Sequence, residues 1–336
     1  MNDDPQANGK KPRITSVAVD NGGTKAAALR YDGDFIPVAF VKTGTLRGNT
    51  TPAETVSKRV DGIISGLGFR QGDEIDTVSG TFPPVFAEKF SSVMHVRRSR
   101  YYLEVYPGLA AAELFGDALF AICGTGVSVF SFVDGKTTIF GGFGSLISDE
   151  GSGYWIARQA FNAAIHDYEG RGPHTVLTSV IAEKYGSIGD NFRDAVFSIY
   201  KRQVPSLVSE IASLTPLVVG AAKADKVAES ILRDAGRLIG EQLTALARKA
   251  EVPEGLPVGI SGSVWKRNPV MFEAFKAVVN DSLPSSEIVV PAYEPLVGTV
   301  MLEMAEKNKA NGITGLTDEN RRILKEYYKE FTFDFQ

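Results

Sequence analysis

Two segments of this chain repeat the same order of short apolar runs and glycine turns. In the first, residues 14–20 (ITSVAVD) end at an acid and meet the turn Asn21-Gly22-Gly23-Thr24. A second apolar run, residues 25–31, leads to the turn Asp32-Gly33, and residues 35–42 form a third run. Short β-branched runs separated by such turns are typical of strands joined by tight hairpins. The segment therefore predicts three consecutive strands.

The same order recurs between residues 118 and 140. The run ALFAIC is followed by a Gly-Thr-Gly turn, a second apolar run, an Asp-Gly turn and a last short run. The two copies share one phase, because Gly124 lies 102 positions after Gly22 and Asp134 lies 102 positions after Asp32. Repeated order in one phase predicts two domains built on the same core.

Helical and buried-strand patterns fill the rest of the chain. The apolar spacing after Pro52 predicts an amphipathic helix, and residues 75–80 and 257–262 read as buried strands. Strands alternating with helices predict an α/β fold with a mixed sheet in each domain. We expect an N-terminal domain over residues 12–117, a C-terminal domain over 118–309, and a C-terminal helix at about 310–336 that packs on the first domain. Further helices are expected at residues 108–115, 153–164, 175–184, 192–200, 221–249 and 318–331.

The glycine turns suggest a polyphosphate site. Glycines let backbone N–H groups approach an anion closely, since no side chain intervenes. Two such turns on opposing domains would hold a polyphosphate from both sides, with hydroxyl donors from Thr24 and Thr125. Asp20, at the end of its strand, is placed to hold a hydrated Mg²⁺ against the phosphates. Either turn alone would more simply be a plain hairpin, so the phased pair carries the hypothesis.

A glycine-rich segment after the second copy adds acids. Residues 141–155 read GGFGSLISDEGSGYW, with Asp149 and Glu150 at the entry to a predicted helix. One interpretation is an acid pair that caps the helix. The other is that one carboxylate points into the cleft and accepts hydroxyl groups of a sugar.

Composition excludes several classes of protein. The chain has 336 residues and a net charge of −4, which does not favour a nucleic-acid partner. No apolar run approaches the roughly 18 residues that span a bilayer. The polar start has no signal-peptide core, so a cytoplasmic protein without membrane or nucleic-acid partners is expected. Cys123 is the single cysteine and excludes an internal disulfide and a multi-cysteine metal site. The basic stretch at residues 95–100 reads as a solvated loop.

Five segments carry a resemblance to a known family. AVDNGGTK, ICGTGVSVFSF, GGFGSLISDEGSGYWIARQA, GISGSVW and PLVGTVMLEM occur in the order seen in N-acetylglucosamine kinases and BadF/BadG/BcrA/BcrD ATPases, of the actin-like ATPase superfamily. The chain resembles this family from about residue 14 to 305, and DEGSGYW is distinctive. The resemblance implies two actin-like (ribonuclease H-like) domains flanking a central cleft that closes on a sugar. It is also compatible with a homodimer.

The resemblance implies ATP and Mg²⁺ as cofactors and gives roles to individual positions. The implied contacts of phosphate and metal are Asp20 (the metal ligand), Asn21, Gly22, Gly23, Thr24 and Lys25, with Gly124, Thr125 and Gly126 in the second turn. Gly262 and Ser263 are implied near adenine and ribose. The implied sugar contacts are Asn49, Gly80 and Asp149.

The chain departs from the family at the general base. A sugar kinase needs a group that takes the proton of the attacking hydroxyl. Aligning the alanine-rich helix places Pro107 where the family has an aspartate, and proline cannot accept a proton. Glu104, three residues earlier, or Asp149, from the other side of the cleft, are the candidate replacements.

Three functions are therefore compared. The first is an ATP-dependent kinase of an amino sugar (N-acetylglucosamine-like) or a related hexose. The second is a catalytically impaired pseudokinase that binds nucleotide or sugar as a sensor, which Pro107 favours. The third, an ATPase that shares an iron–sulfur cluster within a dimer, is rejected because Cys123 is the single cysteine.

Overall fold

The chain folds into ten strands and twelve α-helices over the residues that the computed structural model describes, which are 15–48, 51–186, 192–202, 204 and 206–335. The strands are β1 (Thr15–Asn21), β2 (Lys25–Asp32), β3 (Pro37–Gly44), β4 (Glu74–Gly80), β5 (His95–Tyr101), β6 (Ala118–Cys123), β7 (Val127–Val133), β8 (Lys136–Gly141), β9 (Val258–Ser261) and β10 (Ile288–Val289). The helices are α1 (Ala53–Gly66), α2 (Pro84–Val93), α3 (Val105–Ala111), α4 (Gly153–Tyr168), α5 (Leu177–Tyr185), α6 (Phe192–Lys201), α7 (Leu207–Ala212), α8 (Thr215–Ala221), α9 (Lys226–Lys249), α10 (Pro269–Ser282), α11 (Pro295–Lys309) and α12 (Asp318–Tyr327), with 3₁₀ turns η1 (Ser263–Trp265) and η2 (Lys329–Phe331).

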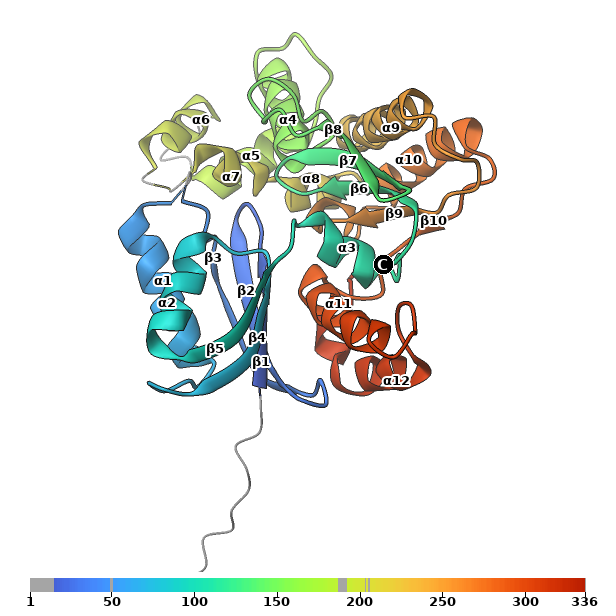
Figure 1. The fold of residues 1–336 in the computed structure, drawn as a ribbon. Coiled ribbons are helices and arrows are strands. Elements are labelled where there is room, and N and C mark those ends of the chain that lie inside the picture. Colours follow the sequence, from blue (N-terminus) through green and yellow to red (C-terminus); the bar gives the residue numbers. More distant parts are fainter. Residues whose placement is uncertain (1–14, 49–50, 187–191, 203, 205, 336) are drawn as a thin grey trace, which may run out of the picture.

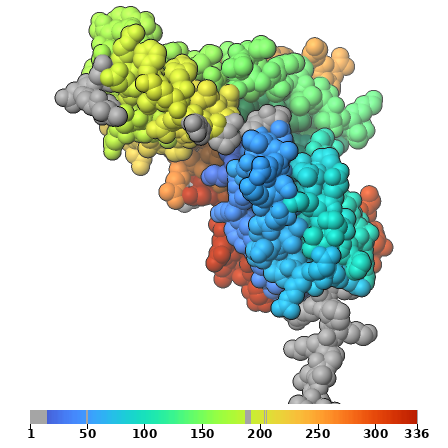
Figure 2. All heavy atoms as spheres, turned by 90° about the vertical axis from the view of Figure 1, so that its left-hand side faces the viewer, coloured from blue at the N-terminus to red at the C-terminus, as the bar shows by residue number. Residues whose placement is uncertain are grey.

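Two five-stranded mixed sheets have the same topology. The first has the order β3-β2-β1-β4-β5, and the second has the order β8-β7-β6-β9-β10. In both, the three hairpin strands are antiparallel, and the strand on the other side of the first is parallel to it. Figure 1 shows the sheets in two lobes, the first below the second, and in Figure 2 the upper lobe (green to yellow) extends to one side beyond the lower (blue to cyan). The predicted repeat and the α/β fold class are confirmed.

Each sheet is covered on both faces, and two helices cross between the lobes. In the first lobe α1 and α2 pack on one face, while the other face is covered by α11 and the C-terminal segment. In the second lobe α4, α9 and α10 cover one face, and α3 packs on the other. Helices α3 and α11 also contact each other, because a Cβ on Gly298 would lie 1.8 Å from the carbonyl oxygen of Pro107. Helices α3 and α11 therefore join the two lobes.

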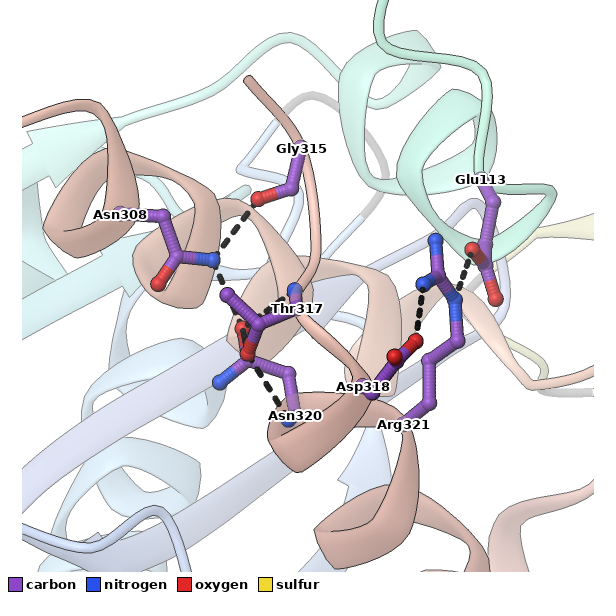
Figure 3. A network of polar contacts seen from close by, with 7 residues as sticks. All are labelled: Glu113, Asn308, Gly315, Thr317, Asp318, Asn320 and Arg321. Carbon is purple, nitrogen blue, oxygen red and sulfur yellow. Dashed lines mark hydrogen bonds and ion pairs between the residues drawn. The ribbon is translucent and has the colours of Figure 1, made fainter. Parts of the chain in front are cut away.

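The C-terminal segment is fixed by polar contacts shown in Figure 3. The Thr317 hydroxyl and the Asn320 side chain form a capping box at the start of α12. The Asn308 amide donates to Asn320 Oδ1 at 2.7 Å, which ties α11 to α12. Arg321 Nε donates to Glu113 at 2.9 Å, just beyond α3. These bonds hold α12 against both the crossing helices and the first lobe.

The basic stretch at residues 95–100 is a strand, so its interpretation as a solvated loop is wrong. It forms β5, the edge strand of the first sheet. Its arginines are paired: Arg97 with Glu74 at 2.7 Å, Arg98 with Asp76, and Arg100 with Glu303 at 2.9 Å. Charged side chains on an edge strand discourage pairing with another chain.

The predicted helix over residues 221–249 is present as α9 but starts five residues later, at Lys226. Asp225 accepts hydrogen bonds from the backbone N–H groups of Val227 and Ala228, so α9 starts there and α8 ends four residues earlier. Within the residues that the structure describes, no single helix is long and apolar enough to cross a membrane. One bent pair, residues 207–221 with 226–249, meets the criteria of length and composition across a bend of 116°.

Candidate functional site

The first glycine turn joins β1 to β2 and is anchored to the segment after β3. The Gly22 N–H donates to the carbonyl of Lys25 at 2.9 Å. The buried Asn21 side chain accepts from the Leu46 N–H at 2.8 Å, and the Thr45 hydroxyl donates to the Gly22 carbonyl at 2.7 Å. Asn21 therefore fixes the backbone of the turn.

The second glycine turn joins β6 to β7 and rests on the start of α4. Gly124 N–H donates to the Gly126 carbonyl at 2.9 Å. The first backbone N–H groups of α4, from Gly153 and Tyr154, donate to the carbonyls of Gly124 and Thr125 at 2.9 and 3.2 Å. The helix thus holds the turn from the side of the second lobe.

The two turns face each other across a cavity of about 510 Å³, which we call the glycine cavity. A Cβ on Gly23 would lie 3.7 Å from the Thr125 hydroxyl oxygen, so the turns are in close approach. Hydroxyl-bearing residues of α7 and α8 and the η1 turn complete the wall. The lining includes Gly23, Thr24, Lys25, Thr45, Arg59, Gly124, Thr125, Ser209, Ser213, Thr215 and Ser263. The geometry therefore brings together most of the residues implied for phosphate and nucleoside.

A second cavity of about 790 Å³ lies on the other side of the first turn, and we call it the apolar cavity. Asn21 lines this cavity, whereas Gly23 lines the glycine cavity. Residues at the carboxyl ends of β4 and β5 form one wall, and residues of β7 and β8 form the other. The lining includes Asn21, Arg47, Thr81, Phe82, Pro83, Tyr101, Leu103, Glu104, Ser128, Phe130 and Ile139.

Asp20 lies at the base of the cleft, amid charges from both lobes. Desolvation raises the pKa of its carboxyl to about 6, with further rises from the carboxylates of Glu104 and Glu294. The cations that oppose this shift are Arg47, which pairs with Glu104 at 2.5 Å, and Lys266, which pairs with Glu294. The ionised form of Asp20 is therefore disfavoured, mainly by burial.

A hydrated divalent cation near Asp20 would favour its ionised form. No three His, Cys, Asp or Glu side chains gather closely enough to hold a metal ion in the part of the chain that the structure describes. Mg²⁺ commonly keeps several waters and binds through one or two carboxylates together with substrate phosphates. Asp20 lines neither cavity but directly precedes the turn that lines the glycine cavity, a position that fits binding of the cation through water.

Helix α3 separates Glu104 from Pro107. The helix starts at Val105, three residues before the predicted start at Gly108. Glu104 immediately precedes it, lines the apolar cavity and is about half exposed. Pro107 is buried within the helix, and its carbonyl abuts Gly298 of α11. Position 104 thus faces the cleft, whereas position 107 belongs to the contact between two helices.

Asp149 is buried beneath the second glycine turn. Burial raises the pKa of its carboxyl, although hydrogen bonds from the backbone of Val127, Gly142 and Gly144 oppose the rise. A Cβ on Gly126 would lie 2.6 Å from Asp149 Oδ2, so the carboxylate rests against the turn. Asp149 appears in the lining of neither cavity.

The helix-capping interpretation of the Asp149-Glu150 pair needs correction. The side chain that caps α4 is that of Ser152, which accepts from the Trp155 N–H at 3.2 Å. Asp149 has a positive φ of 60° and precedes the cap by three residues. The acids therefore belong to the turn before the helix.

Gly80 and Gly262 have the same role in the two lobes. Gly80 is the last residue of β4 and Gly262 directly follows β9, with φ of 125° and 108°. A Cβ would lie 1.9 Å from the carbonyl oxygen of Val19 in one case and 2.1 Å from that of Cys123 in the other. Each glycine lets the chain cross the first strand of its sheet, so that its neighbours Thr81 and Ser263 line the cavities. Asn49, the remaining expected sugar contact, lies outside the described residues.

Two arginines at the site were not among the predicted residues. Arg47 pairs with Glu104 in the apolar cavity. Arg59 reaches from α1 into the glycine cavity and donates to the Thr45 carbonyl at 2.5 Å. The sequence could have pointed to Arg47, because it lies only two positions before the expected sugar contact Asn49. Arg59 occurs in an ordinary amphipathic helix pattern that gives no signal.

Two sheets of one topology, with glycine turns opposed across a cleft, define an actin-like ATPase fold. A model of the BadF/BadG/BcrA/BcrD ATPase family matches residues 17–302, and the chain belongs to this family. It is 26% identical over 305 residues to the N-acetylmuramic acid/N-acetylglucosamine kinase of Clostridium acetobutylicum, which covers 86% of this chain and 98% of the relative.

Solved structures share the fold. A protein of Chromobacterium violaceum described as a candidate N-acetylglucosamine kinase superposes with a TM-score of 0.64 at 22% identity, covering 86% of this chain and 99% of the other. A ROK family glucokinase of Streptomyces griseus, in complex with glucose and AMPPNP, has a TM-score of 0.54 at 17% identity, with 85% and 97% covered. At these identities the likeness concerns the fold.

Proposed function

We propose that the protein is an ATP-dependent kinase that phosphorylates a hydroxyl group of an amino sugar (N-acetylglucosamine-like) or a related hexose. The observation that carries the proposal is the first glycine turn, which separates the glycine cavity from the apolar cavity and has Asp20 at its base. Donor and acceptor would thus meet at one turn. The family and the Clostridium relative support this assignment.

The glycine cavity would hold the nucleotide. Backbone N–H groups of the two turns would face the phosphates, with Thr24 and Thr125 as hydroxyl donors and Lys25 as a cation. Ser263, which follows the strained Gly262, would lie on the side of the nucleoside.

Asp20 would hold the hydrated Mg²⁺ against the phosphates. When bound, Mg²⁺ neutralises charge on the transferred phosphoryl group. Burial raises the pKa of Asp20, and a bound cation would stabilise the ionised carboxylate against this effect.

Glu104 is the group that we assign as general base. It lies in the apolar cavity, about half exposed, whereas Asp149 is buried under the second turn and lines neither cavity. The Glu104 carboxylate would accept the proton of the sugar hydroxyl, while the oxygen of that hydroxyl forms a bond to the γ-phosphorus of ATP. The bond from that phosphorus to the β,γ-bridging oxygen breaks, ADP leaves, and the proton passes from Glu104 to solvent.

The second candidate is a catalytically impaired pseudokinase that binds nucleotide or sugar as a sensor. It rests on Pro107, which stands where the family has its general base and cannot accept a proton. The kinase assignment depends instead on Glu104, which lines the apolar cavity.

An ADP-release assay over a panel of hexoses and amino sugars, with calorimetric titration of Mg²⁺–ATP beside it, tests the proposal. We expect sugar-dependent turnover of about 1 s⁻¹ or more, the low end of ordinary enzymes. Binding of nucleotide and sugar without ADP release would instead establish the sensor. Failure to bind either ligand would contradict the assignment of the cleft.

A further inference from the structure

The apolar cavity has a polar inner end and an apolar outer end. Asn21 ends the inner strand β1 and Thr81 follows the inner strand β4, while Tyr101 ends the edge strand β5. On the opposite wall Ser128 lies on the inner strand β7, and Ile139 lies on its neighbour β8 at the sheet edge. This division is incomplete, because Ser99 on β5 and Phe130 on β7 also line the cavity, but the large exposed apolar side chains lie at the outer end.

The outer end exposes large apolar side chains to solvent. Tyr101, Leu103 and Ile139 are 59%, 55% and 54% exposed, and all three line this cavity. Phe82 continues the wall inward, with its ring centroid 6.1 Å from that of Tyr101 in an edge-on arrangement. Exposed apolar residues gathered from both lobes around one cavity mark a binding surface more often than scattered ones do.

The polar groups at the inner end are few and mostly engaged. Asn21 accepts from Leu46, and the Thr81 hydroxyl donates to the Tyr102 carbonyl at 3.1 Å. A water molecule takes up about 30 Å³ in the liquid, and a sugar ring displaces roughly six or seven waters, so the ring occupies about 200 Å³. The cavity of about 790 Å³ is several times larger. One ring at the inner end would leave the apolar outer end open.

We propose that the acceptor is an amphiphilic sugar derivative, whose hydroxylated ring lies at the inner end and whose apolar substituent lies along Phe82, Tyr101, Leu103 and Ile139. This inference rests on the proposed function, since it places the ring beside Asp20 and Glu104. The substituent is either an acyl chain on the amine or an alkyl or aryl group on the anomeric oxygen. Both have the same apolar chemistry.

Calorimetric affinities, measured with a non-hydrolysable ATP analogue present, test the inference independently of turnover. One arm compares N-acetyl-, N-butanoyl- and N-hexanoylglucosamine, and the other compares methyl and hexyl N-acetylglucosaminides. In one of the two arms we expect the affinity to rise at least twofold for each added methylene group. A fully buried methylene would raise it about fourfold. A flat or falling affinity in both arms overturns the inference, as does no binding by any member.

Leu103→Ser and Ile139→Ser are the decisive variants. Both residues are more than half exposed, so the fold should survive, and equal melting temperatures check this. We expect the ratio of long-chain to short-chain affinity to fall at least threefold in each variant. Val38→Ser is the matched control, because Val38 is 53% exposed on β3 and lines neither cavity.

The two levels of the proposal fail in different ways. ADP formation from the short-chain sugars without any chain-length gain overturns the amphiphilic acceptor alone. A chain-length gain without ADP formation from any sugar overturns the kinase assignment alone.

Discussion

The strand that ends in the first glycine turn carries Asp20, whereas the matching strand of the second lobe ends in the apolar Ile122 and Cys123. An acid does lie near the second turn, but Asp149 arrives from a later segment and is buried beneath the turn, where its Oδ1 has no hydrogen-bond partner among the residues that the structure describes. One acid faces charges across the cleft, and the other supports a loop. The repeat thus supplies the same backbone twice, and the charged chemistry lies in one copy.

The glycines that permit a close approach of two backbone segments, in contrast, occur in both lobes. Gly80 and Gly262 cross their sheets in the same conformation and with the same close approach to a strand carbonyl. This difference teaches that the supporting glycines of the two lobes are equivalent, while their acids are not.

The largest expected effect comes from Asp20→Asn. Removing the charge that would hold the hydrated cation should lower kcat about a thousandfold, or about 4 kcal/mol of transition-state stabilisation. The control is Asp134→Asn, which removes the same charge from the second copy. Asp134 lies at an exposed hairpin position with φ of 50°, a conformation that asparagine tolerates. Steady-state kinetics should find that control unchanged. Equal losses in the two variants would break the asymmetry.

Next in size is the substitution of the crossing glycines. Gly80→Ala and Gly262→Ala each place a Cβ within about 2 Å of a strand carbonyl at positive φ. We expect each to lower the free energy of unfolding by about 3 kcal/mol, from clash and backbone strain together. Urea denaturation measures this loss. If one variant were as stable as wild type, the glycines of the two lobes would not have the same structural role.

The pH dependence of the enzyme should report Asp20. The pKa of Asp20 is raised to about 6, so the free enzyme loses the ionised form as the pH falls through 6. The kcat/KM for Mg²⁺–ATP should then fall about tenfold per pH unit below 6. Between about pH 6 and pH 4 the folded chain binds a proton at Asp20 that the unfolded chain does not. The contribution of Asp20 therefore raises the free energy of unfolding as the pH falls through this window. A profile flat down to pH 4.5 would contradict the placement of Asp20.

Much of the fold could be predicted because strands and turns have strong local signals. The hairpins of both copies follow from β-branched runs and paired Asp-Gly turns. Strand β5 was missed because its sequence HVRRSRY has no apolar alternation, and its arginines are satisfied by acids far along the chain or on the next strand.

The site was predictable at the turns and less so at α3. Proline is usually a helix breaker, so the helix was expected to begin after Pro107. It begins at Val105, because a proline in the first turn gives up an N–H that has no partner there in any case. That shift separates Glu104 from Pro107. The contact with Gly298, nearly two hundred residues away, leaves no local pattern.

The smallest expected effect sharpens the contrast among glycines. Gly62 lies in the exposed interior of α1, and a Cβ there would meet no atom within 4 Å. Gly62→Ala should raise the free energy of unfolding by about 0.5–1 kcal/mol, since alanine is the better helix former. The same urea titration measures it. A loss comparable to that of the crossing glycines would show that close approach is not what distinguishes Gly80 and Gly262.

The most direct test of the asymmetry between the lobes is the single-turnover rate of phosphoryl transfer in Glu104→Gln and Asp149→Asn. Our account predicts that Glu104→Gln slows transfer at saturating ATP and sugar by a factor of about 10²–10⁴, the usual contribution of a general base. It predicts that Asp149→Asn stays within about tenfold of wild type, because that carboxylate supports the second turn. The reverse order of effects would place the base in the second lobe and contradict the account.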